Sequence, residues 1–176
     1  MRFSAEAEGV LRDVGWCPGR RVDVSLWRTR LAAAGLRMHE AAEEFLSEFG
    51  GLVFGISGPG ISCACEPFEL DPLLAEGEED RFADWSEVLG KSLYPIGEGD
   101  QGRYFLAIDE IGAIYLVADW VAAFGPADGA VEGLTLGVAP TVVAEECWRE
   151  NEAVPERPGS SAPSVAGRVT RLHGST

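Results

Sequence analysis

Apolar residues recur every three or four positions along the first fifty residues of the chain. This spacing is typical of helices that turn one face toward a core, and the repeats are separated by glycines, which often end helices. In the third repeat we expect Phe45, Leu46 and Phe49 to be buried. The pattern predicts three helices, over about residues 3–14, 24–34 and 39–48.

After residue 51 the pattern changes to short apolar runs between turn residues, as in antiparallel strands and hairpins. Pro95 favours an edge position for its strand, because proline has no N–H to donate to a neighbour. We expect one further amphipathic helix, with Phe82, Trp85, Val88 and Leu89 on its apolar face, and a last helix or packing segment over residues 131–138. The predicted strands cover residues 52–56, 61–70, 93–97, 103–110 and 113–125.

Helices followed by strands that are joined through short turns predict an α+β fold, because such turns leave no room for the crossover helices of a parallel sheet. A chain of 176 residues is long enough for one globular domain with a sizeable core. The composition places this domain at residues 1–148. Residues 149–176 are rich in proline, serine and glycine without periodicity, so we expect a flexible tail there.

The net charge of −15 is unevenly distributed, since residues 66–110 alone carry a net charge of −10. Such a field repels nucleic acids and anionic membranes and attracts basic partners. The N-terminal segment carries acids where a signal peptide needs an apolar stretch, and no run approaches the roughly 20 apolar residues of a membrane helix. Four cysteines are too few to suggest a disulfide framework. These features predict a cytoplasmic protein that binds neither membranes nor nucleic acid.

The acidic stretch between Glu76 and Glu110 is the candidate contact surface for a protein partner, although acid that only maintains solubility is the simpler alternative. Trp85 is a candidate anchor because acids flank it, but a core position is the preferred interpretation for this residue. We expect the first acids of the segment on a loop and helix start, and the last two at a hairpin tip. The candidate residues are Glu76, Glu78, Glu79, Asp80, Asp84, Trp85, Glu98 and Asp100.

Three patterns resemble a dinucleotide, metal or catalytic site, but in each case the surrounding residues do not support such a site. The GxGxxG at residues 97–102 precedes a predicted strand, whereas a dinucleotide site needs a helix there. Cys63 and Cys65 lack a second ligand pair for zinc and are expected to pack in the core. Of the two histidines, His173 lies in the expected tail and His39 is expected to form a solvent-facing pair with Glu43. We therefore predict no enzyme activity, no cofactor and no metal.

Five phrases of the sequence, in order, resemble the third subgroup of the SUKH superfamily of bacterial immunity proteins. They are GWCPGR (15–20), AAEEFLSEFGGL (41–52), EEDRFADWSEVLG (78–90), LYPIGEGDQGRYFLAIDEIGAIYLV (93–117) and a short GV-P near residue 137. The resemblance covers about residues 10–140. It implies a single α+β domain with helices packed on a curved, mostly antiparallel sheet.

The resemblance also implies a function, which is to bind and neutralise a cognate polymorphic toxin, with nucleases and deaminases prominent among such toxins. Together with the charge, it predicts a toxin with a basic surface as the partner. Two alternatives stay open. One is an intracellular regulatory interaction module of the same fold that has no toxin partner, and the other is a small carboxylate-based enzyme.

Overall fold

The computed structural model of the chain describes residues 2–145 and contains five α-helices and one short 3₁₀ turn in that part. The expected tail lies outside the described residues. Ser4 begins the first helix, because its hydroxyl accepts a hydrogen bond from the Ala7 N–H at 3.3 Å. The helices are α1 (Ala5–Asp13), α2 (Ser25–Ala33), α3 (Glu40–Phe49), η1 (Pro72–Ala75), α4 (Glu79–Leu89) and α5 (Ala127–Leu136).

Seven strands form one open sheet in the order β1-β4-β5-β6-β7-β8-β9, and every neighbouring pair is antiparallel. A separate hairpin pairs β2 (Gly58–Pro59) with β3 (Ala64–Cys65). The sheet and the helices confirm the predicted α+β class. The strands of the sheet are β1 (Val53–Phe54), β4 (Phe68–Glu69), β5 (Tyr94–Gly99), β6 (Tyr104–Ile108), β7 (Ala113–Val117), β8 (Trp120–Pro126) and β9 (Thr141–Glu145).

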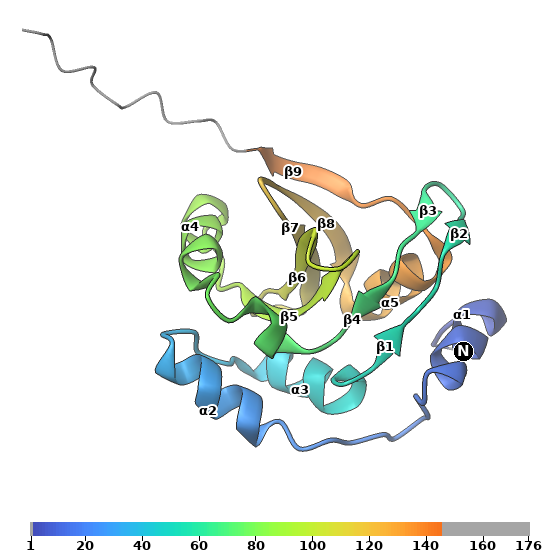
Figure 1. Cartoon of the computed structure of the whole chain (residues 1–176), viewed down its shortest axis with the longest axis horizontal. Coiled ribbons are helices and arrows are strands. Elements are labelled where there is room, and N and C mark those ends of the chain that lie inside the picture. The colour runs from blue at the N-terminus through green and yellow to red at the C-terminus, as the bar shows by residue number, and fades with distance from the viewer. Residues whose placement is uncertain (1, 146–176) are drawn as a thin grey trace, which may run out of the picture. The chain divides into compact units, whose positions relative to one another are not determined.

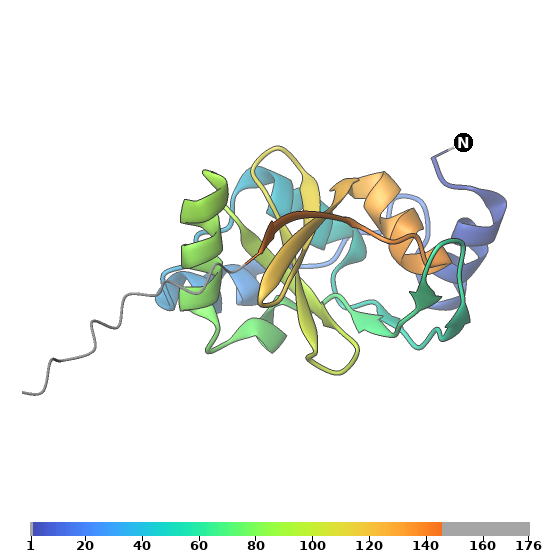
Figure 2. The same ribbon diagram turned by 90° about the horizontal axis from the view of Figure 1, so that it is seen from above.

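Helices cover both faces of the sheet, with α4 on the opposite side of the strands from α5 (Figures 1 and 2). Successive residues of a strand point to opposite faces, so Leu106 belongs to the larger core with α1, α3 and α5, whereas Ala107 packs in the smaller core under α4. Phe45, Leu46 and Phe49 are buried in the larger core, as predicted. The two cores therefore fix the sheet from both sides.

Asp109 organises the tight turn between β6 and β7. Its side chain is fully buried and accepts hydrogen bonds from the Tyr115 hydroxyl at 2.9 Å and from the backbone N–H groups of Ile111 and Ala113. Lys91 forms an ion pair with the same carboxylate. Burial opposes ionisation here, but these donors outweigh it and hold the pKa of Asp109 below its usual value. Gly112, the last residue of the turn, has a positive φ of 86°, which glycine adopts without steric cost.

His39 is a structural residue, and its predicted solvent-facing pair with Glu43 is wrong. Its Nδ1 accepts the Ala42 N–H at 3.1 Å and so caps α3, while Nε2 lies within hydrogen-bond distance of two carbonyl oxygens, those of Ser92 and Ile108. Glu43 instead forms an ion pair with Arg28. The imidazole thus ties the start of α3 to β6 and to the segment before β5.

Two of the predicted strands are each divided in the structure. Residues 113–125 form β7 and β8 with a two-residue turn between them, and residues 61–70 form only the short strands β3 and β4. In the second case Pro67 interrupts the pairing, because it cannot donate to a ladder. Strand β9 had no prediction, since its five residues follow a helix and a proline without a clear alternation.

The edge position predicted from Pro95 is wrong, because β5 lies between β4 and β6. The proline is nevertheless tolerated, since β4 pairs only with Glu98 and Gly99 at the far end of β5. Beside Pro95, on the edge of β5 that faces away from β6, no strand of the described residues is paired. The missing N–H of the proline therefore removes no hydrogen bond between strands on that edge. A register shift between Pro95 and Gly97 adjusts the pairing with β6.

Candidate functional site: the acidic end of the sheet

Two turns, at residues 100–103 and 118–119, lie at the same end of the central sheet, because antiparallel neighbours alternate in direction. The chain just before β4 reaches the same end, where the Asp100 N–H donates to the Pro67 carbonyl at 2.8 Å. The start of α4 joins them through Arg81. We call this region the acidic end and define it by six of its carboxylates: Glu66, Glu69, Glu78, Glu98, Asp100 and Asp119.

Two arginines at the acidic end are each held by two of these carboxylates. Arg81 pairs with Glu78 at 2.7 Å and with Asp119 at 3.4 Å. Arg103 pairs with Asp100 at 2.7 Å, and its guanidinium lies 3.6 Å from the Glu66 carboxylate. Hydrogen bonding to the carboxylates raises the pKa of both arginines. Six carboxylates and two arginines leave this end with a net negative charge.

Glu69 and Glu98 face each other across strands β4 and β5, and neither forms an ion pair within the described residues. Burial, and to a lesser degree the charge of Glu69, raises the pKa of Glu98 above its usual value. Like charges directly opposite each other on an antiparallel pair destabilise it. A cation brought by a partner would relieve this repulsion, so the pair is chemically suited to an arginine or lysine from outside.

A polar cavity of about 180 Å³ opens between the start of α4 and the two turns. Glu78, Arg81 and Asp119 line one part of it, and the backbone at Gly102 and the side chain of Phe105 lie at another. The Trp85 indole N–H donates to the Ala118 carbonyl at 3.2 Å, which helps to hold α4 against the turn beside this cavity. The arrangement can hold polar and cationic groups.

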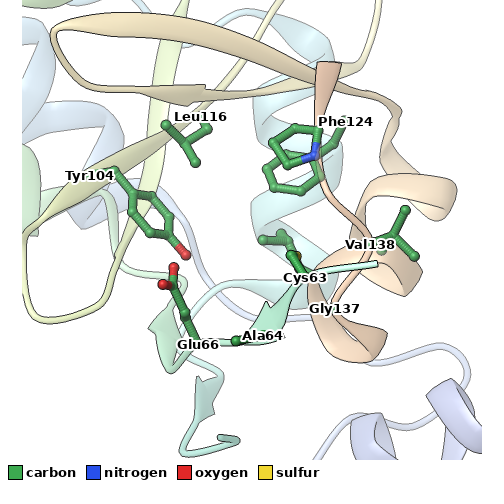
Figure 3. A pocket seen from close by; sticks show the side chains of 11 residues that line it. Cys63, Ala64, Glu66, Tyr104, Leu116, Phe124, Gly137 and Val138 are labelled. Carbon is green, nitrogen blue, oxygen red and sulfur yellow. The ribbon is translucent and has the colours of Figure 1, made fainter. Parts of the chain in front are cut away.

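A second cavity, of about 60 Å³ and mainly apolar, lies on the opposite face of the same sheet end. Figure 3 shows the Tyr104 hydroxyl directed toward the Glu66 carboxylate on one side and Phe124 and Val138 on the other. Burial and the neighbouring Glu66 raise the pKa of Tyr104. The acidic end thus combines a polar cavity on one face with an apolar cavity on the other.

The predicted contact residues are only partly brought together. Glu78, Glu98 and Asp100 lie at the acidic end, although all three are partly buried rather than fully exposed. Asp80 is exposed and Glu79 half-buried in the first turn of α4, and Asp84 is exposed one turn further along the helix. Glu76 is exposed outside this group and pairs with Arg30 of α2 at 2.8 Å.

Trp85 is only 4% exposed and packs in the smaller core, so the role of partner-facing anchor is excluded for it in this conformation. The preferred interpretation as a core residue is confirmed. On α4, the buried positions are Phe82 and Trp85, whereas Val88 is 58% exposed.

Sequence reasoning missed three acids of this site, Glu66, Glu69 and Asp119. Glu66 and Glu69 reach the site only because β4 pairs with β5, about thirty residues further along the chain. Asp119 lies in a turn inside a segment that was predicted as one continuous strand. No local spacing predicts either arrangement, but the acid-proline-aromatic-acid run at residues 66–69 is a weak signal of a strand end with charged neighbours.

The glycines of the GxGxxG pattern have a packing role. An added Cβ at Gly97 would lie 1.9 Å from the Glu69 carbonyl oxygen, and one at Gly99 would meet the ring of Tyr104 at 2.1 Å. A strand, β6, follows the motif, as expected. The motif therefore allows β4, β5 and the Tyr104 side chain to approach closely.

The predicted core positions of Cys63 and Cys65 are wrong. Cys63 is exposed and lines the apolar cavity, and Cys65 is half-buried. Cys65 lies in β3 of the small hairpin and Cys63 directly precedes it, so both are outside the main sheet and have little core to face. Among residues 2–145, no three His, Cys, Asp or Glu side chains are grouped so that they could hold a metal ion.

Geometry and charge define an end of the sheet that is acidic and carries a polar cavity on one face and an apolar cavity on the other. The family of SUKH-3 immunity proteins matches residues 3–137, and the chain belongs to this family. No curated protein and no solved structure matches the chain. None of the helices in the described residues has the length and apolarity that crossing a membrane requires.

Proposed function

We propose that this protein binds and neutralises a cognate toxin in the cytoplasm of the producing cell, and that the acidic end of the sheet is the contact surface. Membership of the SUKH-3 immunity protein family supports the immunity role. The observation that carries the choice of surface is the opposed pair of Glu69 and Glu98, which has no cation within the described residues. In this proposal the protein acts by binding and has no catalytic activity.

The chemistry of the partner follows from this surface. Six carboxylates with two arginines favour a basic surface, such as the substrate site of a nuclease or of a deaminase that acts on nucleic acid. Long-range attraction would mainly raise the association rate, while desolvated contacts in the two cavities would determine how slowly the complex dissociates. The same negative field disfavours nucleic acid and anionic membranes as partners.

A charge-reversal variant tests this proposal. Glu78, Glu79 and Asp80 border the polar cavity or lie in the adjacent first turn of α4. Replacing all three with lysine should slow association with the cognate toxin domain, to be sought among the neighbouring genes, by about tenfold or more at low salt, and should flatten the salt dependence. The measurement is the association rate across a salt series, with circular dichroism to verify the fold.

The matched control reverses three acids elsewhere, by Glu6→Lys, Glu40→Lys and Glu44→Lys. These acids are exposed, belong to the early turns of α1 and α3 and form no ion pair among the described residues, and their reversal changes the net charge equally. The control should keep most of the wild-type association rate. Equal rates for the two variants would show that net charge matters rather than this surface, and would refute the assignment of the contact.

A further inference from the structure

The apolar cavity at the acidic end is small, open to the outside and suited to receive one side chain. Its walls come from β7, β8, α5 and the chain that follows α5, with Leu116, Phe124, Leu134 and Val138 as the main apolar residues. Val138 is 37% exposed and Cys63 is exposed, so the cavity is accessible from outside. Its volume of about 60 Å³ has room for one small aliphatic side chain.

One side of this cavity is acidic. The Glu66 carboxylate lies beside the Tyr104 hydroxyl at the cavity wall (Figure 3), and Arg103, at 3.6 Å from Glu66, is held more closely by Asp100 at 2.7 Å. The Arg103 side chain is 69% exposed, so it can turn away from Glu66 at little cost. An apolar socket next to a carboxylate is complementary to an apolar side chain that has a cationic neighbour.

We propose, on the basis of the immunity function above, that this cavity receives a valine- or leucine-sized side chain of the toxin, from a segment that also supplies an arginine or lysine to Glu66. Burial of the aliphatic group would provide the slow dissociation that surface charge alone does not give. The adjacent cation of the toxin, bound to Glu66, would determine which aliphatic side chain of the toxin enters the cavity. Together with the polar cavity on the other face, the toxin would then contact both sides of the sheet end.

Two glycines of α5 provide a matched pair of variants. A Cβ at Gly133 would point into the cavity, at 3.6 Å from Val138 and 3.8 Å from Phe124, which are ordinary contact distances. A Cβ at Gly129 would meet nothing within 4 Å. Neither glycine has a positive φ, so alanine fits the helix at both positions and should not lower the thermal midpoint. Only Gly133→Ala reduces the volume of the cavity.

The first measurement is the affinity of both variants for an inactivated form of the cognate toxin domain used in the charge-reversal test. Gly133→Ala should weaken binding about tenfold, mainly through faster dissociation, and Gly129→Ala should bind like the wild type. Glu66→Gln in the full chain should also weaken binding and reduce its salt dependence. Equal affinities for the two glycine variants would overturn the proposal.

The second measurement is alkylation of the wild-type protein by iodoacetamide, followed cysteine by cysteine in a mass spectrometer. Cys63 lines the cavity, whereas Cys17 is exposed on the connection between α1 and α2 and serves as the internal reference. The toxin domain should slow the labelling of Cys63 at least about tenfold and leave that of Cys17 unchanged.

The outcomes separate this proposal from the immunity function itself. Toxin binding with an unchanged labelling rate of Cys63 would refute the entry of a toxin side chain into the apolar cavity, but would leave the proposed immunity function intact. The quantity compared is the change in each labelling rate when toxin is added, because burial and the neighbouring Glu66 raise the pKa of the Cys63 thiol and so slow its labelling in the free protein as well. Absence of any toxin binding by the wild type would overturn both.

Discussion

At one end of the sheet, where residues 109–112 join β6 to β7, the buried Asp109 accepts hydrogen bonds from four donors. At the opposite end Glu69 of β4 and Glu98 of β5 face each other, and neither pairs with a cation from residues 2–145. The two ends belong to one rigid sheet and differ in what their acids contact. At the first end the protein supplies every donor itself. At the second end no cation of residues 2–145 relieves the repulsion, which is the arrangement expected of a surface that a cationic partner completes.

The largest expected effect is a loss of stability at the end of the sheet that holds Asp109. Asp109→Ala should lower the free energy of unfolding by about 3–5 kcal/mol, because it leaves Lys91 without its partner and removes the acceptor of two backbone N–H groups. Denaturant titration of the variant and the wild type gives this difference. A loss below about 1 kcal/mol would mean that Asp109 does not organise the turn, and would break the comparison.

The same residue predicts a pH dependence. Because the folded-state pKa of Asp109 lies below its ordinary value of 3.8, its contribution to stability is fully present above that value. It should be lost as the pH falls through the folded-state pKa. Asp109→Ala should therefore differ most from the wild type near neutral pH and progressively less in acid, which thermal unfolding at a series of pH values can measure.

At the acidic end, by contrast, removal of an acid should stabilise the protein. Glu98→Gln keeps the shape of the side chain and removes the repulsion with Glu69, so it should raise the free energy of unfolding by about 0.2–1 kcal/mol at pH 7. The folded-state pKa of Glu98 is raised, so the penalty in the wild type is present above that pKa and disappears as the pH falls below the ordinary value of 4.5. Denaturation at pH 7 and near pH 3 should show a gain only at the higher pH; destabilisation at pH 7 would show that Glu98 is already satisfied.

The smallest effect is expected at Asp119. Its side chain is 86% exposed, and its carboxylate comes no nearer than 3.4 Å to the Arg81 guanidinium. Asp119→Asn should change the free energy of unfolding by less than about 0.5 kcal/mol, because exposed ion pairs contribute little. Association with the toxin should nevertheless slow at low salt if the acidic end is the contact. A clear loss of stability in denaturant titration would assign Asp119 a structural role instead.

The elements that the sequence predicted well are those whose pattern is local. The spacing of Phe45, Leu46 and Phe49 is enough to place α3 against the core, and the apolar run after the glycines at residues 97–102 is enough to predict the strand β6. The turn at residues 118–119 was missed because Ala118 and Asp119 interrupt a long apolar run without glycine or proline, so nothing in the local chemistry marks a turn there.

The site was less predictable than the fold, because it depends on pairing between distant strands. Glu98 was a candidate from its place in a hairpin, but its opposition to Glu69 follows only from the register of β4 with β5. Trp85 has acids on both sides in the sequence, yet the helical period turns its side chain inward and theirs outward. Charge along a sequence indicates the sign of a surface, whereas its geometry requires the tertiary structure.

Carboxyl footprinting tests the central claim most directly. The full chain is treated with a water-soluble carbodiimide and glycine ethyl ester, alone and in complex with the inactivated toxin domain, and modification is quantified residue by residue. The account predicts protection of Glu66, Glu78, Asp100 and Asp119 at the acidic end, with Glu6, Glu40 and Glu110 modified equally in both states. Protection of Glu110 beside the Asp109 turn, with the acidic end modified as in the free protein, would contradict it.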